Sequence, residues 1–191
     1  PPPERRYRKL FVIATEGVKT EFEYFAIFNS ESSTIRVKCI KGSHGCSPPQ
    51  VLKRMAKYIK QQGLDSLDEA WIVVDKDEWT DQQLSLLHQW AENRVGRGFA
   101  LSNPKFEYWL LLHFEDGTDI LSPRDCDNRL KRYIPEYDKG IDCRIFSNER
   151  IYDAVKRAEN RDTPPCCDWP RNCGSTVYRL VKNILRENNP A

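Results

Sequence analysis

The stretch Ala70-Trp71-Ile72-Val73-Val74 is an uninterrupted apolar run that ends directly in Asp75-Lys76-Asp77-Glu78. Five apolar residues without polar alternation predict a strand that is buried on both faces, which is typical of a parallel sheet covered by helices. Ligands of such sheets bind outside the carboxyl ends of the strands. The acidic residues after this run therefore lie where a functional site is expected.

An earlier stretch repeats this arrangement of an apolar strand followed by an acid. Leu10-Phe11-Val12-Ile13-Ala14 is a second short apolar run, and Thr15-Glu16-Gly17 follows it. Neighbouring strands lie about 5 Å apart and their loops are short. If the two strands are neighbours, Glu16, Asp75 and Asp77 share one crevice.

The segments around these strands alternate between strand and helix patterns. Further strands are predicted over 35–39 and 99–102, and helices over 20–28, 47–62, 80–91 and 104–114. The alternation predicts an α/β fold with a Rossmann-like, mostly parallel sheet of about four strands flanked by helices. Helical patterns near 128–133, 149–160 and 176–186 predict an α-helical C-terminal elaboration. We expect a basic N-terminal tail (1–9), an α/β core (10–114) and an α-helical region (115–191) packed on that core.

Four of the predicted helices begin with start or capping signals, which include Ser47-Pro48-Pro49-Gln50 and Thr80-Asp81-Gln82-Gln83. Thr20-Glu21-Phe22-Glu23 has the form of a capping box, and Asn103-Pro104 can cap and begin the helix after the fourth strand. In the first of these helices, Phe22, Phe25 and Phe28 fall at helical spacing and are expected in the core.

The three acids at the strand ends predict a metal centre. Carboxylates packed this closely repel one another unless a hard cation neutralises them, and Mg²⁺ or Mn²⁺ favours carboxylate oxygens together with water and phosphate oxygens. Residues two apart in an extended segment face the same side, so Asp75 and Asp77 can both act as ligands. Glu16 could serve as a ligand or as a general base, and the sequence leaves both roles open.

Glu107 is a further metal-ligand candidate because it lies in an otherwise apolar helix. A buried carboxylate needs a cation, a metal or hydrogen-bond donors. The alternative is that Glu107 only faces the positive N-terminus of its helix. Accessory or substrate-binding roles are expected of residues beside the predicted crevice or on the Glu107 helix, namely Gly17, Lys19, Glu21, Lys76, Glu78, Asn103 and His113. Ordinary structural roles, such as first-turn acids, a solvated lysine and a core histidine, are the alternatives for these residues.

Three segments carry a resemblance to a known family. TEGVKTE (15–21), VVDKDE (73–78) and LSNPKFEYWLLLHF (101–114) resemble the signature blocks of the RloB family. The first two blocks are also similar to the Toprim pattern of topoisomerases, primases and OLD-type nucleases, which pairs a strand-end glutamate with Asp-x-Asp on a later strand. This chain departs from the fuller Toprim motif because no glycine follows Asp77 at the expected position.

The resemblance has implications for fold, activity and partners. It implies a Toprim-like core and Mg²⁺-dependent chemistry on phosphodiesters, with Glu16, Asp75 and Asp77 in the catalytic site. RloB-like proteins are associated with bacterial and archaeal defence loci, so the resemblance also implies an antiviral role beside an AAA/ABC-type ATPase partner. Nucleic acid is the implied substrate, as DNA or RNA.

Composition narrows the class of protein without identifying it. No apolar run among the 191 residues approaches the roughly 20 that a membrane span requires. The chain begins PPPERRYRKL without an apolar signal region, so we expect a cytoplasmic protein without a membrane partner. A homo-oligomer is compatible with the sequence. The formal net charge of +2 is too small to indicate nucleic-acid binding. Basic clusters at residues 5–9 and 53–60 fit a phosphate track or solvated faces equally well.

The seven cysteines are expected to be reduced thiols, because a chain of this size needs no disulfides and an odd number leaves one unpaired. Zinc would require Cys166, Cys167 and Cys173 to meet His44 and Cys46. The spacing disfavours a structural zinc site, because it contains no Cys-x-x-Cys pair.

Two other classes of function compete with a nuclease. A non-catalytic interaction subunit of an ATPase-containing complex would keep the fold and be indifferent to metal. A doubly wound nucleotide-binding module is disfavoured, because Thr15-Glu16-Gly17 lacks the glycines that admit a pyrophosphate.

Overall fold

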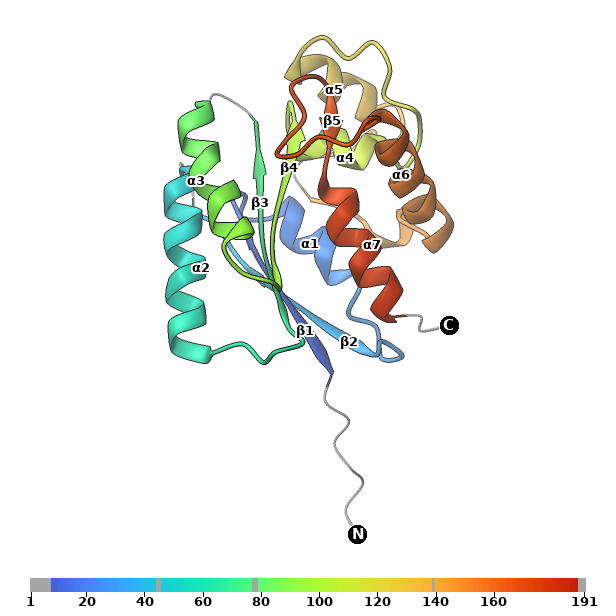
Figure 1. Ribbon diagram of the computed structural model, residues 1–191. Helices are drawn as coiled ribbons and strands as arrows, with labels where there is room; N and C mark the ends of the chain where they lie inside the picture. Colours follow the sequence, from blue (N-terminus) through green and yellow to red (C-terminus); the bar gives the residue numbers. More distant parts are fainter. Residues whose placement is uncertain (1–7, 44–45, 77–78, 139, 189–191) are drawn as a thin grey trace.

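A five-stranded sheet runs through the centre of the computed structural model, which describes residues 8–43, 46–76, 79–138 and 140–188 (Figure 1). The strand order is β2-β1-β3-β4-β5. The strands are β1 (Lys9–Thr15), β2 (Ile35–Ile40), β3 (Glu69–Asp75), β4 (Arg97–Asn103) and β5 (Gly174–Ser175). The first four are mutually parallel, and β5 is antiparallel to β4. This confirms the predicted α/β class with a mostly parallel sheet, and it is consistent with a Toprim- or Rossmann-like arrangement.

Helices cover both faces of the sheet. Figure 1 shows α2 (Pro48–Gln62) and α3 (Asp81–Glu92) on one face. The other face carries α1 (Thr20–Ala26), α4 (Phe106–Leu111), α6 (Asn148–Arg161) and α7 (Val177–Asn188), with α5 (Pro123–Leu130) above α4 and a 3₁₀ turn at Cys143–Ile145. Within the described residues, no helix combines the length and apolar character needed to cross a bilayer.

The apolar runs of the strands serve two separate cores. In β1, Phe11 and Ile13 belong to the core on the α1 side, whereas Val12 and Ala14 belong to the core on the α2 side. Successive side chains of a strand point to opposite faces, so a strand covered on both sides must be apolar at every position. The continuous apolar pattern of the sequence is the direct result.

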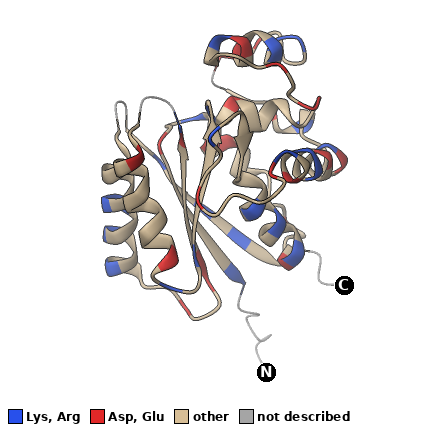
Figure 2. Ribbon diagram, turned by 45° about the horizontal axis from the view of Figure 1, so that its top comes forward, with Lys and Arg blue, Asp and Glu red and all other residues tan. Residues whose placement is uncertain are grey.

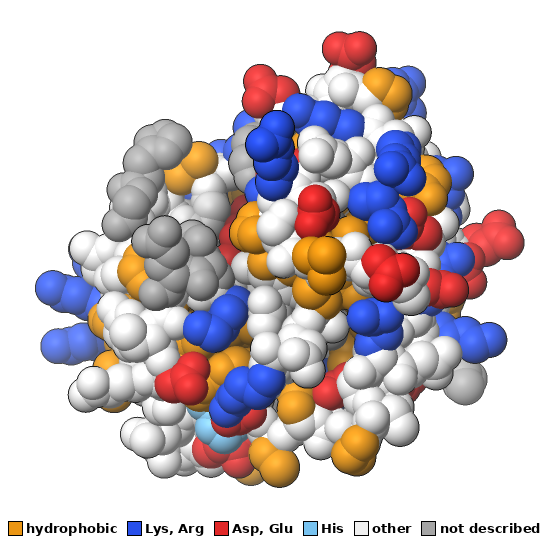
Figure 3. All heavy atoms as spheres, turned by 90° about the horizontal axis from the view of Figure 1, so that it is seen from above, with side chains coloured by type: hydrophobic (Ala, Val, Ile, Leu, Met, Phe, Trp, Pro, Cys, Tyr) orange, Lys and Arg blue, Asp and Glu red, His pale blue; other side chains and the backbone are white. Residues whose placement is uncertain are grey.

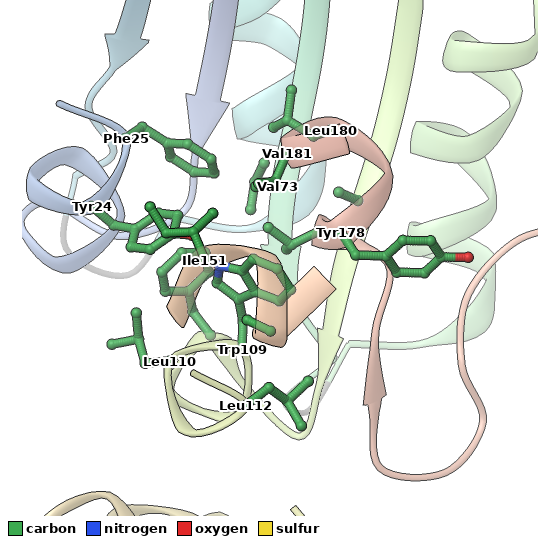
Figure 4. Close-up of a cluster of buried hydrophobic side chains, with 14 of the residues drawn as sticks. Tyr24, Phe25, Val73, Trp109, Leu110, Leu112, Ile151, Tyr178, Leu180 and Val181 are labelled. Atoms are coloured by element: carbon green, nitrogen blue, oxygen red, sulfur yellow. The ribbon is translucent and has the colours of Figure 1, made fainter. Parts of the chain in front are cut away.

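The larger core joins the first 114 residues to the C-terminal region. Figure 4 shows side chains from both parts packed together, with Tyr24 and Trp109 beside Ile151 and with Val73 beside Val181. All five side chains are at most 1% exposed. The C-terminal helices therefore cover the sheet face that the first part of the chain leaves apolar.

The chain order places the switch point of the sheet between β1 and β3. After β1 the chain forms α1 on one face, and after β3 it forms α3 on the other. Loops that leave neighbouring parallel strands toward opposite faces open a crevice at the carboxyl ends of those strands. The register pairs Thr15 of β1 with Val73 of β3, so Glu16 and Asp75 end adjacent strands.

The C-terminal region adds one strand that was not predicted. β5 has only two residues and forms beside β4, where the Ser102 and Ser175 hydroxyls lie 2.8 Å apart in a buried contact. Two residues carry no readable periodicity, so tertiary pairing alone defines this strand.

The predicted helix at 128–133 begins earlier, at Pro123, and ends at Leu130. Ser122 is its N-cap, and the Ser122 side chain accepts a hydrogen bond from the Asp125 N–H at 3.1 Å.

The predicted capping box at Thr20 is wrong. Lys19 occupies the N-cap of α1 without a side-chain cap, and the Thr20 hydroxyl lies 3.3 Å from that of Tyr137. The Glu23 carboxylate accepts a hydrogen bond from the Ile141 N–H at 2.7 Å. Both side chains of the expected box are thus engaged by the segment after α5.

The expected core phenylalanines of α1 are partly corrected. Phe25 and Phe28 are buried, but Phe22 is only half-buried and carries the Lys41 ammonium 3.9 Å from its ring centroid. Tyr24, whose hydroxyl made it a less obvious candidate, is fully buried. The cost of burying its hydroxyl is offset by a hydrogen bond to His113, whose Nε2 lies 3.0 Å away.

Candidate active site

Glu16 is hydrogen-bonded to the end of β3. Its backbone N–H donates to the Val73 carbonyl at 3.3 Å, which continues the ladder beyond β1. Its carboxylate accepts from the Asp75 N–H at 3.2 Å and from the Trp79 indole N–H at 2.8 Å. These donors hold the carboxylate beside the end of β3.

Asp75 ends β3 and caps the short helix that follows β4. Its Oδ1 accepts a hydrogen bond from the Phe106 N–H at 2.8 Å. Phe106 is the first residue of α4, whose N-cap, Lys105, offers no side-chain cap. The predicted cap at Asn103-Pro104 is therefore wrong. The helix spans Phe106–Leu111 rather than 104–114, and a strand-end aspartate supplies its cap.

Three glutamates act on the Asp75 carboxylate at this edge of the sheet. The pKa of Asp75 is raised well above its ordinary value, first by burial and then by the negative charges of Glu21, Glu107 and Glu16. The Phe106 N–H opposes part of this rise. Glu21 and Glu107 are only 6% and 2% exposed, so water screens their charges poorly. The structure thus groups Glu16 and Asp75 from the strand ends with Glu21 and Glu107 from the helices beside them.

Glu107 is hydrogen-bonded to a residue of the C-terminal region. The Tyr137 hydroxyl donates to Glu107 Oε1 at 2.9 Å, and the Thr20 hydroxyl lies 3.3 Å from the same phenol oxygen. Burial and the Glu107 charge both raise the pKa of Tyr137, so the phenol stays protonated. No local pattern marks Tyr137 in the sequence, because its contact with Glu107 spans 30 positions.

Two glycines allow the chain to pack closely around Glu16. A Cβ at Gly17 would lie 2.1 Å from Glu21 Oε2, and a Cβ at Gly42 would lie 1.9 Å from the Glu16 carbonyl oxygen. The Gly42 N–H donates to the Gly17 carbonyl at 3.1 Å. The loop after β2 therefore supports the turn after β1, and only a residue without a side chain fits at Gly42.

Three predicted accessory residues lie at the margin of this cluster. Lys19 is exposed and extends toward Gly140. Lys76 donates from Nζ to the carbonyl of Trp79 at 2.7 Å, and the indole of Trp79 donates to Glu16. Asn103 donates to the Pro170 carbonyl at 3.1 Å and so anchors the 162–173 loop.

His113 lies in the aromatic core rather than among the carboxylates. Its Nδ1 is 3.0 Å from the Trp109 carbonyl and its Nε2 is 3.0 Å from the Tyr24 hydroxyl. Burial lowers the pKa of His113 to about 3, so the ring is neutral at physiological pH. In this arrangement Nδ1–H donates to the carbonyl and Nε2 accepts from the phenol.

The oxygen donors suit a hard divalent cation. Glu16 and Asp75 offer carboxylates from neighbouring strands, and a cation would relieve the repulsion that raises the Asp75 pKa. Asp77 and Glu78, the other acids predicted here, lie outside the described residues. Within the described ranges, no three His, Cys, Asp or Glu side chains form a group that could hold a metal ion by themselves.

The cysteines predicted as thiols differ in how far they are buried. Cys46 is buried at the start of α2, whereas Cys166 and Cys173 line a cavity of about 170 Å³ near the end of α6. Burial raises the pKa of Cys166 to about 11. All seven cysteines are free, and His44 lies outside the described residues.

The Arg54 side chain does not belong to the exposed basic cluster predicted over residues 53–60. Figure 2 shows basic positions along the outer side of α2, where Lys53, Lys57 and Lys60 are exposed. The Arg54 guanidinium instead donates to the Thr15 carbonyl at 2.7 Å and to the Lys41 carbonyl. It therefore clamps the ends of β1 and β2 behind the Glu16 turn.

We expect Arg54→Met to lower the free energy of unfolding by about 2 kcal/mol, because two carbonyls lose a charged donor. Lys53→Met, at the exposed neighbouring position, should change it by less than about 0.5 kcal/mol. Urea denaturation followed by circular dichroism measures both. Equal stability of the two variants would contradict the clamp.

Figure 3 views the carboxyl ends of the strands from above. Little acidic surface is visible beside the grey atoms, and basic and apolar side chains lie around it. This agrees with the burial of Glu21 and Glu107.

These features define a class of α/β protein with a carboxylate cluster at the switch point of a parallel sheet. The family model described as RloB-like protein matches residues 11–184, so the chain belongs to the RloB-like family. Comparisons with curated proteins and with solved structures give no match.

Proposed function

We propose that this protein is a divalent-metal-dependent nuclease that hydrolyses phosphodiesters in DNA or RNA. The supporting observation is the cluster of Glu16 and Asp75 at the ends of adjacent parallel strands with Glu21 of α1 and Glu107 of α4, in which burial and the charges of the three glutamates raise the pKa of Asp75. Repulsion among these carboxylates lowers the stability of the fold, so folding gives no reason for the cluster. Carboxylates with shifted pKa values that lie in a crevice are typical of functional sites. The RloB-like family assignment supports the same reading.

Glu16, Asp75 and Asp77 would hold Mg²⁺ or Mn²⁺, with Glu107 at a second position. The bound cation would supply activation of water and stabilisation of charge on the phosphodiester. The Asp75 backbone N–H and the Trp79 indole hold Glu16, and so orient it either to bind the cation or to accept a proton from the attacking water. The biological role proposed with this activity is antiviral defence in the cytoplasm, together with an AAA/ABC-type ATPase.

The test is cleavage of labelled plasmid and of total RNA with Mg²⁺ or Mn²⁺, by the protein alone and with an ATPase encoded beside it. We expect metal-dependent cleavage by the wild type. Glu16→Gln should reduce it more than roughly 100-fold, beyond the effect usual for residues that only support metal ligands. Glu92→Gln, on the exposed end of α3, should cleave like the wild type.

Cleavage by Glu16→Gln at the wild-type rate would place the active site elsewhere. A wild type that neither cleaves nor binds metal under any of these conditions would contradict the nuclease proposal and leave a non-catalytic interaction subunit.

A further inference from the structure

We propose that Tyr137 is a positioning residue of this site, which fixes the Glu107 carboxylate for binding a divalent cation. The inference rests on the proposed function, and it assigns a role to the C-terminal region. Tyr137 follows α5 and is 6% exposed. It therefore reaches the carboxylate cluster from the part of the chain that contributes none of the four acids.

The hydrogen bonds give the contact a direction. A tyrosine hydroxyl carries one hydrogen, and an ionised carboxylate can only accept. Tyr137 therefore donates to Glu107 Oε1 at 2.9 Å, and Thr20 donates to the phenol oxygen at 3.3 Å. The resulting chain of donors runs from the first turn of α1, through Tyr137, to the first turn of α4.

This chain of donors affects the ligand strength of Glu107. Donors to a buried carboxylate stabilise its ionised form and restrict its rotation, as outer residues do for metal ligands in general. Glu107 is 2% exposed, so protein groups rather than bulk water set the orientation of its carboxylate. Its charge also reaches Asp75, whose pKa it helps to raise. Tyr137 thus prepares a carboxylate that acts on the proposed metal position.

Tyr137→Phe tests this role, because it removes the hydroxyl and keeps the ring. In the full chain, we expect the affinity for Mn²⁺, measured by isothermal titration calorimetry, to fall by about tenfold or more. Thr20→Val, which removes the donor to the phenol oxygen, should lower the affinity less.

The matched control is Tyr108→Phe on α4. The Tyr108 hydroxyl donates to the Gly117 carbonyl at 3.0 Å, and the residue is 0% exposed. Tyr108→Phe loses one buried hydrogen bond and Tyr137→Phe loses two, so thermal melts of the metal-free proteins should show a decrease for both variants. Only Tyr137→Phe should weaken Mn²⁺ binding.

The outcomes separate this inference from the proposed function. Equal Mn²⁺ affinities of Tyr137→Phe, Tyr108→Phe and the wild type would overturn the role of Tyr137 and leave the metal site intact. A wild type that binds no Mn²⁺ would overturn the proposed metal site and this inference with it.

Discussion

Asp75→Asn is expected to abolish metal-dependent cleavage and to stabilise the metal-free fold. Asparagine retains an oxygen that can accept the Phe106 N–H, so the cap of α4 survives. The change removes a charge that burial and three neighbouring carboxylates disfavour. Cleavage should fall more than roughly 100-fold, because a ligand is lost rather than a supporting residue.

The stabilisation by Asp75→Asn should depend on pH. A raised pKa means that the folded protein binds the Asp75 proton more tightly than the unfolded chain does. The free energy of unfolding of the wild type therefore falls as the pH rises from about 4, the ordinary pKa of an aspartate, through the raised value. The stability that Asp75 contributes in its protonated form is lost over that window.

Thermal melts in the presence of a chelator, from pH 3.5 to 8, measure this effect. We expect the Tm of Asp75→Asn to exceed that of the wild type increasingly as the pH rises, and to approach it at the acid end. A constant difference across the range would falsify the proposed repulsion at Asp75. Collapse of the variant at all pH values would show that the carboxylate is needed for folding.

Gly42→Ala is expected to disrupt both the fold and the site. The new methyl group would lie 1.9 Å from the Glu16 carbonyl oxygen, which is backbone and can move only with the turn after β1. Overpacking of this kind costs about 1–3 kcal/mol of folding free energy. Displacement of the turn should also weaken Mn²⁺ binding about tenfold or more, because it moves Glu16 away from β3.

Ser43→Ala is the control for Gly42→Ala, because Ser43 is exposed in the same loop. It should keep wild-type stability within about 0.5 kcal/mol and wild-type Mn²⁺ affinity. Urea denaturation and calorimetry measure the two quantities. Wild-type behaviour of Gly42→Ala in both would show that the loop after β2 moves aside and does not support Glu16.

The sequence alone determined the four parallel strands and the two acids at their carboxyl ends. Continuous apolar runs predict strands covered on both faces, and the register confirms that Glu16 and Asp75 end neighbouring strands. These features were readable because burial on both faces leaves a local pattern. The carboxyl end of each strand can likewise be located from the residues that stop that pattern.

Tertiary structure alone decided which side chains surround those acids. The cap that Asp75 gives to Phe106, the Trp79 indole on Glu16 and the Tyr137 hydroxyl on Glu107 all bridge separate elements. A capping box can be read from local spacing, and that reading failed at Thr20 because a distant tyrosine engages its hydroxyl. Hydrogen bonds between distant segments leave no periodic trace in a single sequence, because their partners are set by how the helices pack on the sheet.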